Sequence, residues 1–295
     1  MGNDLSAAAL AAARLLAKPI ALDSQYPASA CFRNIQLTDI PAVMSKHGFR
    51  VGAALMDRWF MAPAFSMPIS WKGSARAGFD NRSLDGHHVD TTAVSMSWAL
   101  RFGRTQETFT ELRRAVLGTA SVESLNRSKE ELFSNLKRAG KFGAYVSTFG
   151  DGRSVLDLHE TAHMNARPVS SNGLEKLTDP IDDLYCALGA FTLHVAAEGV
   201  ITPLKRSGDQ STHQVDVHGL AFYIRDCYDF TDDQPLGNWN ASEVQMLPAR
   251  HLRLAENASF RQWRERHQRG GDFIVFSDIH RQKLSAPLTW YFKGH

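Results

Sequence analysis

The sequence predicts an α+β protein in which a mainly helical N-terminal half packs on a β-rich C-terminal half. Apolar residues recur at helical spacing before residue 145 and alternate with polar residues in several stretches after it. The composition, 43% hydrophobic and 22% charged in 295 residues, is that of a globular chain. We expect residues 35–145 to form the helical region. Residues 146–295 should form an antiparallel sheet or partial barrel packed with it as a single large domain.

The helical half opens with a separate segment and a pair of helices. Residues 1–34 are expected to form a helix and a Pro-containing linker. Thr38 then has the character of an N-cap residue, and Gly48 that of a helix stop. Residues 49–60 repeat apolar side chains at helical spacing, and this second helix must end before Pro63.

The rest of this half is expected to contain a long loop, a strand and two helices. Residues 63–90 are rich in Gly and Pro and predict the loop. A helix is expected over residues 106–117, and Ser128 with Glu131 predicts a capping box for another helix that ends at Gly140. Three alternating apolar residues predict the strand: Val94, Met96 and Trp98.

The second half shows mainly strand patterns. Asp179 and Pro180 predict the start of a short helix, and Asn257 predicts the cap of a helix over residues 258–268. The segments expected to be extended are residues 142–149, 191–195, 215–224, 272–276 and 288–292.

Charge and missing motifs exclude several classes of protein. The 33 Lys and Arg residues against 31 Asp and Glu residues leave a net charge of +2, which argues against nucleic-acid binding over the whole surface. No apolar run reaches the ~18 residues that span a bilayer. The sequence contains neither a GxxxxGKS phosphate loop nor a GxSxG elbow. Three cysteines are expected to stay reduced: Cys31, Cys186 and Cys227.

The sharpest motif is HETAH at residues 159–163, which fits HExxH. On a helix, His159 and His163 share one face and can bind a zinc ion, while Glu160 acts as general base on a metal-bound water. Ser154 and Asp157 favour a helix start before the motif. The alternative is a polar helix with two unrelated histidines. The candidates for a third zinc ligand are Glu175, Asp179, Asp182 and Asp183.

A second group of polar residues lies where a predicted strand ends. Asp226 and Asp229 are three residues apart, with Tyr228 between them. Two carboxylates and a phenol at such a position can bind a cation or act in acid–base chemistry. The alternative is a strand that turns with aspartate side-chain caps.

A basic segment follows at residues 261–269 and contains Trp263. Such a helix can contact phosphates. Because the net charge is only +2, a solvated face with Trp263 turned inward is the favoured interpretation.

Several longer motifs resemble the proteobacterial domain-of-unknown-function family 6402. They are LTDIPAVM at 37–44 with MDRWF at 56–60, DPIDDLYCALGAFTL at 179–193, RDCYDF at 225–230 with LGNW at 236–239, and GGDFIVFSD at 270–278. The resemblance spans about residues 35–285. This family is often encountered near type VI secretion components. The resemblance therefore implies an effector or accessory protein of that machine, and HExxH is not part of its pattern.

A local resemblance concerns the strand-end residues. Asp226, Tyr228 and Asp229 are similar to the active-site loop of colicin M-type toxins, which cleave the lipid-linked peptidoglycan precursor. The His-Arg pair that follows in those toxins is absent here, where Pro235 and Leu236 stand. The pair His280-Arg281, at the end of a later strand, is the candidate to replace it in space.

Three functions follow as expectations. The first is an antibacterial toxin of a type VI secretion system, a hydrolase of the target cell envelope or peptidoglycan precursor. Its catalytic residues would be Asp226, Tyr228, Asp229, Asp278 and His280. The second is a zinc metallopeptidase that uses the HExxH motif. The third is a non-catalytic adaptor or immunity-type protein.

These expectations share a setting. The protein would be made in the cytoplasm of the producing bacterium and reach a target cell without a signal peptide. Its partner would be a spike or adaptor of the secretion machine, or a cognate immunity protein.

Overall fold

The computed structural model describes residues 35–72, 79–152, 154–169, 181–207, 210–231, 235–240, 244–245 and 253–294. These residues divide into two compact units. Unit 1 falls within the ranges Met1–Ser66, Ser171–Gly189 and Asp229–Asp272. Unit 2 falls within Met67–Ser170, Ala190–Tyr228 and Phe273–His295. Each unit therefore combines segments from both halves of the sequence, whereas the sequence-based division was placed at residue 145.

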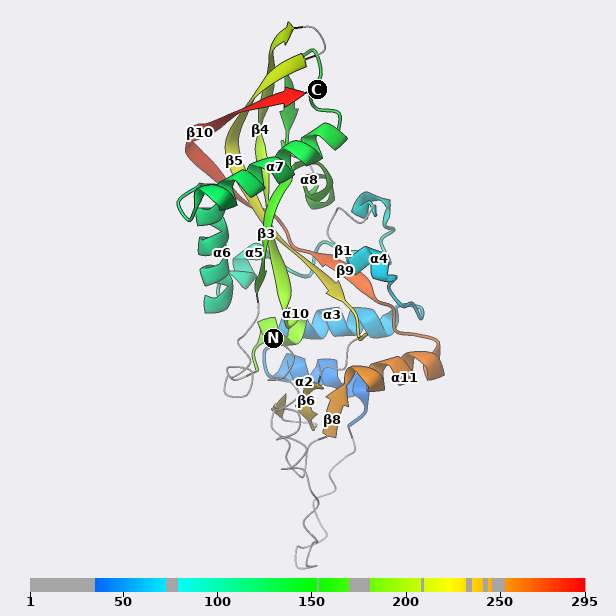
Figure 1. The fold of residues 1–295 in the computed structure, drawn as a ribbon. Helices are drawn as coiled ribbons and strands as arrows, with labels where there is room; N and C mark the ends of the chain where they lie inside the picture. Colours follow the sequence, from blue (N-terminus) through cyan, green and yellow to red (C-terminus); the bar gives the residue numbers. More distant parts are fainter. Residues whose placement is uncertain are drawn as a thin grey trace, which may run out of the picture. The chain divides into compact units, whose positions relative to one another are not determined.

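Unit 1 is mainly helical and carries a small sheet (Figure 1). Its helices are η1 (Leu37–Asp39), α2 (Ile40–Lys46), α3 (Arg50–Met61), α10 (Asp183–Leu188) and α11 (Asn257–His267). Its strands are β6 (Pro235–Trp239), β7 (Val244–Gln245) and β8 (Arg253–Glu256), in the antiparallel order β7-β6-β8.

The core of unit 1 forms around Trp59 of α3, whose side chain is fully buried. Its ring packs edge-on against Phe230 at 4.8 Å and Phe260 at 5.6 Å between ring centres. Asp183, at the start of α10, accepts hydrogen bonds from the backbone N–H groups of Val51 and Gly52 at the start of α3. Buried aromatic contacts thus join α3 to α11, and a carboxylate joins α3 to α10.

Unit 2 contains a large sheet and its covering helices. Its helices are α4 (Ile69–Lys72), η3 (Asn81–Ser83), α5 (Met96–Ala99), α6 (Gly103–Val116), α7 (Val122–Arg138) and α8 (Val155–Ala162). Its strands are β1 (Val89–Asp90), β2 (Ser147–Phe149), β3 (His163–Val169), β4 (Phe191–Ser207), β5 (Gln210–Tyr228), β9 (Phe273–Phe276) and β10 (His280–Gly294).

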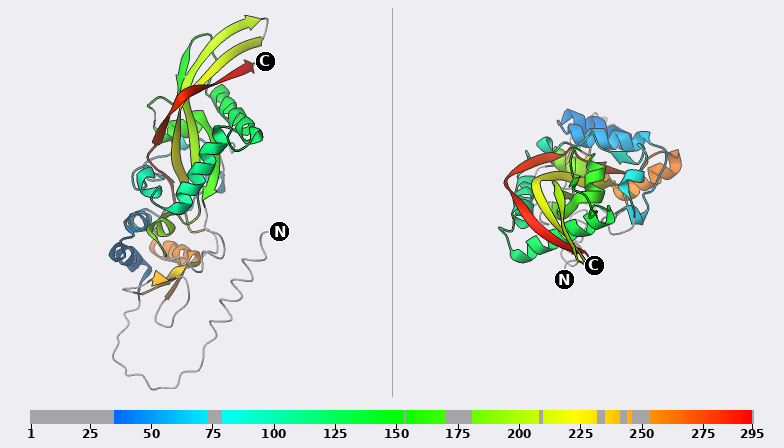
Figure 2. Two further views of the ribbon diagram at one scale, coloured as in Figure 1. Left: turned by 90° about the vertical axis from the view of Figure 1, so that its left-hand side faces the viewer. Right: turned by 90° about the horizontal axis from the view of Figure 1, so that it is seen from above.

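Among the described residues, this sheet has seven strands and is built on the long antiparallel pair β4 and β5. β5 pairs with β9 and β10 along its other edge, while β4 pairs with β2 and β3. The strands are antiparallel except that β1 runs parallel to β9. The sheet curls strongly (Figure 2), and helices α6, α7 and α8 contact β3. The centre of β4 and β5 is therefore buried, as residues 193–197 and 220–225 show.

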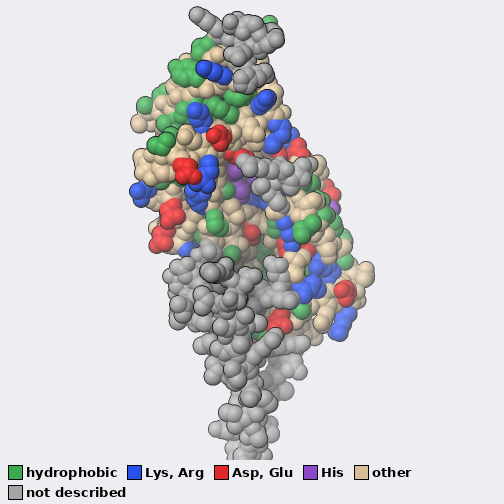
Figure 3. Space-filling view, in the orientation of Figure 1, with side chains coloured by type: hydrophobic (Ala, Val, Ile, Leu, Met, Phe, Trp, Pro, Cys, Tyr) green, Lys and Arg blue, Asp and Glu red, His purple; other side chains and the backbone are tan. Residues whose placement is uncertain are grey.

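The fold class predicted from the sequence is confirmed. Helices dominate the N-terminal half of the chain, and strands dominate the C-terminal half. Within the described residues, no helix has the length and apolar character needed to cross a membrane. On the face drawn in Figure 3, Lys and Arg side chains are interspersed with Asp and Glu, in agreement with the small net charge.

Two local predictions in the helical half were wrong. Residues 96–99 form helix α5, not a strand, because Ser95 Oγ accepts the N–H of Trp98 and Asp278 Oδ1 accepts the N–H of Met96. Helix α7 begins at Val122, with Ser121 as its cap, so Ser128 lies inside the helix and its hydroxyl donates to the carbonyl of Ser124. Capping hydrogen bonds set both helix starts: Ser95 and the distant Asp278 cap α5, and Ser121 caps α7.

Other predicted elements differ from the observed ones by smaller amounts. The expected loop at 63–90 contains the short elements α4, η3 and β1, and only residues 147–149 of the segment 142–149 form a strand. Glu256, not Asn257, stands at the N-cap position of α11. The predicted N-terminal helix and the pair Asp179-Pro180 lie outside the described residues.

Candidate functional site

Three histidines and a tyrosine meet in the interior of unit 2. His159 lies on α8, His163 is the first residue of β3, and His194 lies on β4. The strand register sets His194 directly opposite Tyr223 of β5, and their rings stack at 5.4 Å between centres. We call His159, His163, His194 and Tyr223 the histidine cluster. Helix α8 supplies one side of the cluster and the sheet supplies the other.

The histidine rings form a nearly equilateral triangle. The distances between ring centres are 5.5 Å for His159–His163, 5.2 Å for His159–His194 and 5.1 Å for His163–His194. His163 Nε2 lies 3.1 Å from His194 Nδ1, and His159 Nδ1 lies 2.9 Å from the Tyr223 hydroxyl. His159 Nε2 is buried and has no hydrogen-bond partner in the described part of the chain. The cluster thus holds an unused nitrogen in a polar setting.

Burial keeps most of this cluster uncharged. It lowers the pKa of His159 and His194 well below the ordinary value, and neighbouring His163 and Arg225 lower both further. Burial also raises the pKa of the Tyr223 phenol, with Arg225 opposing and Glu160 reinforcing this rise. His159, His194 and Tyr223 are therefore neutral near pH 7, the form in which an imidazole nitrogen accepts a proton or binds a metal.

A charged network lies beside the cluster. Glu160 Oε1 accepts hydrogen bonds from the backbone N–H of Asn81 at 3.0 Å and from its side-chain amide at 2.7 Å. The amide oxygen of Asn81 accepts from Arg225, whose guanidinium also donates to the carbonyl of Trp71. Asn81 therefore links a buried carboxylate to a buried guanidinium, which offsets the cost of burying both charges.

The HExxH motif is placed differently from a helical zinc-peptidase site. Ser154 caps α8 as predicted, with its Oγ accepting the N–H of Asp157. The helix ends at Ala162, so His163 belongs to β3. Glu160 Oε1 is held by Asn81, which disfavours Glu160 as a general base. As the side chains stand, no group of three or more His, Cys, Asp or Glu in the described ranges is arranged to hold a metal ion.

The proposed third zinc ligands have other surroundings. Asp182 accepts the N–H of Tyr185 as the cap of α10, and Asp183 holds the start of α3. Glu175 and Asp179 lie outside the described residues. The imidazole that lies beside both His159 and His163 is that of His194.

The strand-end residues have structural partners. Asp229 Oδ1 accepts from the N–H and hydroxyl of Thr231, as in an aspartate-capped turn. The ring of Tyr228 is buried and stacks on Phe273 at 5.1 Å between centres. Asp278 Oδ1 accepts the N–H of Met96 and so holds the start of α5. Asp226 is half-buried on β5.

The strand register separates Asp226 from His280. Asp226 pairs with Val275, while His280 pairs with Phe222, which is 226 − 222 = 4 positions away along β5. At about 3.3 Å per residue, these positions are about 13 Å apart. His280 is exposed, with its ring 5.6 Å from Phe109. The register thus does not bring these two residues together, and their catalytic roles stay a prediction.

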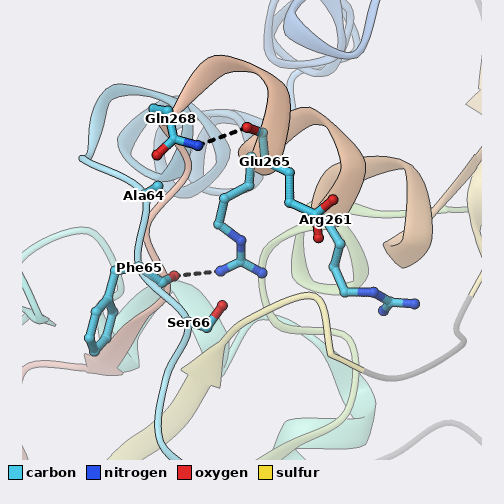
Figure 4. A pocket seen from close by; sticks show the side chains of 7 residues that line it. Ala64, Phe65, Ser66, Arg261, Glu265 and Gln268 are labelled. Carbon is cyan, nitrogen blue, oxygen red and sulfur yellow. Dashed lines mark hydrogen bonds between the residues drawn. The ribbon is translucent and has the colours of Figure 1, made fainter.

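The basic helix α11 borders a hollow of about 260 Å³ in unit 1 (Figure 4). Arg264, which reaches across it, donates to the carbonyl of Phe65 and to Asp272. Arg261 donates to the carbonyls of Phe230 and Thr231. Trp263 turns inward against Phe60, as expected for a solvated helix face. These guanidinium groups serve the packing of unit 1.

Sequence reasoning missed His194, Tyr223 and Asn81. One signal was present for the first two, because each is a polar side chain in the middle of a strand whose neighbours are apolar and buried. Asn81 lies in the Gly- and Pro-rich region of residues 63–90, and nothing local marks its contact with Glu160.

The fold and site define an α+β protein whose curled sheet carries a buried histidine cluster. No curated protein and no solved structure matches the chain. The model of a family of unknown function (DUF6402) matches residues 35–256 and 251–292. The chain belongs to this family.

Proposed function

We propose that this protein is an antibacterial effector associated with type VI secretion and that its toxicity depends on the histidine cluster. The motifs shared with family 6402 support the first part of the proposal. The observation that carries the second part is the burial of His159, His194 and Tyr223 together beneath α8. Buried polar groups cost stability, and proteins retain them together mainly where they act.

The chemistry that we propose for this site is hydrolysis. A neutral imidazole nitrogen can accept a hydrogen bond from an attacking water, and a neutral phenol can donate one to the substrate. The His163 side chain keeps 11% of its surface exposed, so the cluster comes nearest to solvent at this residue. We propose a substrate in the envelope of the target cell, such as a peptidoglycan precursor.

Expression in a susceptible bacterium tests this function. The full chain is produced in the cytoplasm and, with an added export signal, in the periplasm, and growth is followed. We expect arrest from the periplasmic form, its loss in His194→Ala, and its retention in His218→Ala. His218 is an exposed histidine on β5 and provides the matched control. Immunoblots and thermal melting confirm equal amounts of folded protein.

The variants Asp226→Ala and Asp229→Ala separate the two candidate sites. If these variants lose toxicity and His194→Ala keeps it, the strand-end residues carry the activity and the cluster does not. Normal growth with both forms of the wild-type chain contradicts an effector.

A specific observation favours a second candidate, a non-catalytic adaptor or immunity-type protein. The carboxylate of Asp229 caps its own turn and that of Asp278 holds the start of α5, so both have structural roles, as expected for a non-catalytic protein. This candidate predicts no toxicity and a stable complex with a secretion component or a toxin. Pull-down from a strain that carries the secretion genes, followed by gel filtration, measures such a complex.

A further inference from the structure

The triangle of histidine rings has the size of a three-imidazole metal centre. A tetrahedral zinc ion bound at about 2.1 Å holds its ligand nitrogens roughly 3.4 Å apart and the ring centres roughly 5 Å apart. The three ring-centre distances here are 5.1, 5.2 and 5.5 Å. His163 Nε2 and His194 Nδ1 are already 3.1 Å apart.

One of the three proposed ligand nitrogens, His159 Nε2, is available to bind a cation. His159 Nε2 is buried without a partner in the described residues, while its Nδ1 contacts Tyr223. When Nδ1 carries the proton and donates a hydrogen bond to the Tyr223 hydroxyl, Nε2 presents a lone pair. A hydrogen bond of this kind on the far nitrogen orients the ligating histidines of metal centres. His163 Nδ1 has no hydrogen-bond partner in the described residues and lies 3.9 Å from Glu131 Oε1.

We propose that His159, His163 and His194 together bind one divalent transition-metal ion of the zinc class, through His159 Nε2, His163 Nε2 and His194 Nδ1. As the side chains stand in the described residues, these three histidines are not arranged to hold an ion, so binding requires their rings to turn and the contact between His163 and His194 to be replaced. The ligands go beyond the HExxH pair, because His194 comes from β4 and Glu160 is directed to Asn81. This inference deepens the role of the cluster in the proposed function.

Metal binding is measured without any readout of toxicity, so failure of one proposal is distinguishable from failure of the other. The full chain is stripped with a chelator and titrated with Zn²⁺ and with Co²⁺, whose visible absorption reports tetrahedral coordination. We expect one ion per chain and at least about 100-fold weaker binding in His194→Ala. His218→Ala and Glu160→Gln should bind like the wild type, and Tyr223→Phe about 10-fold more weakly.

Counting the metal ligands in the wild-type protein tests the proposal even if a variant fails to fold. X-ray absorption of the zinc-loaded chain is expected to show three imidazole ligands. Absence of stoichiometric binding overturns the proposal. It is also overturned if folded His194→Ala or His194→Gln binds as tightly as the wild type, or if the absorption shows two imidazoles.

Discussion

At the residue scale, the structure of unit 1 depends on one buried carboxylate. Asp272 Oδ1 accepts hydrogen bonds from the indole N–H of Trp59 and from the guanidinium of Arg264, both at 2.9 Å. The Asp272 side chain is fully buried, and Arg264 keeps 8% of its side chain exposed. Because water cannot replace the carboxylate, both donors depend on it.

Asp272→Ala is therefore expected to destabilise the protein strongly. It removes the counter-charge of the buried Arg264 guanidinium and the acceptor of the buried Trp59 indole N–H, which should lower the free energy of unfolding by about 3–5 kcal/mol. Urea unfolding followed by tryptophan fluorescence measures the change. Glu123→Ala, which breaks the exposed pair with Arg127, should leave the midpoint nearly unchanged. Equal effects of the two substitutions would contradict the assigned role.

The residues of the histidine cluster also show which contacts of a site can be predicted from a sequence. His159 and His163 were identified because their spacing is local and four residues bring two side chains near each other. His194 joins them only through the pairing of β3 with β4, and Asn81 holds Glu160 from 79 residues away. Such contacts depend on strand register and loop path, which local patterns do not specify.

At the scale of elements, helix α7 offers a paired test of capping. Ser121 Oγ accepts the N–H of Ser124 at the start of the helix, and Ser134 is exposed inside it. Ser121→Ala should lower the free energy of unfolding by about 1 kcal/mol. Ser134→Ala should leave it unchanged or raise it slightly, since Ala is the better helix former. Thermal unfolding by circular dichroism compares the two, and shifts of the same sign would argue against the cap.

The junction of β4 and β5 depends on a glycine. A register shift occurs at Glu198 and Gly199, where a Cβ atom on Gly199 would lie 2.0 Å from the carbonyl oxygen of Asp216 and 2.8 Å from the ring of Phe149. Gly199→Ala should cost at least about 1–3 kcal/mol, because the backbone must move. Gly143→Ala is the control, since no atom lies within 4 Å of its Cβ position. Chemical denaturation measures the free energy of unfolding of both variants. If Gly199→Ala is as stable as the wild type, the bulge can widen to accept the added methyl group.

Elements with strong local signals were predicted well. Residues 49–60, with apolar side chains at helical spacing and Pro63 beyond, correspond to α3 at Arg50–Met61. The alternation at 215–224 lies inside β5. The prediction failed where Ser95 and Asp278 cap a short helix, because Asp278 is 182 residues from the N–H that it accepts. The short alternation of apolar residues is compatible with either a strand or a helix, and a long-range hydrogen bond of this kind decides between them.

At the scale of the whole molecule, the chain passes between its two units several times. Trp59 precedes residue 145, but its partners Phe230, Phe260 and Asp272 follow it, all within unit 1. In unit 2, Asn81 precedes residue 145 and its partner Glu160 follows it. The sequence pattern changes near residue 145, but the residues before and after this position contribute to the cores of both units.

This interleaving predicts that fragments 35–145 and 146–295 do not fold separately. Each would expose apolar surface that the other covers in both units, so neither should show cooperative thermal unfolding or dispersed amide NMR signals. The chain 35–295 is the control and should unfold cooperatively. Because the missing contacts are complementary, co-expressed fragments should associate and elute together in gel filtration. A cooperatively unfolding fragment 146–295 would show instead that its strands hold a complete core without Trp59 and Asn81.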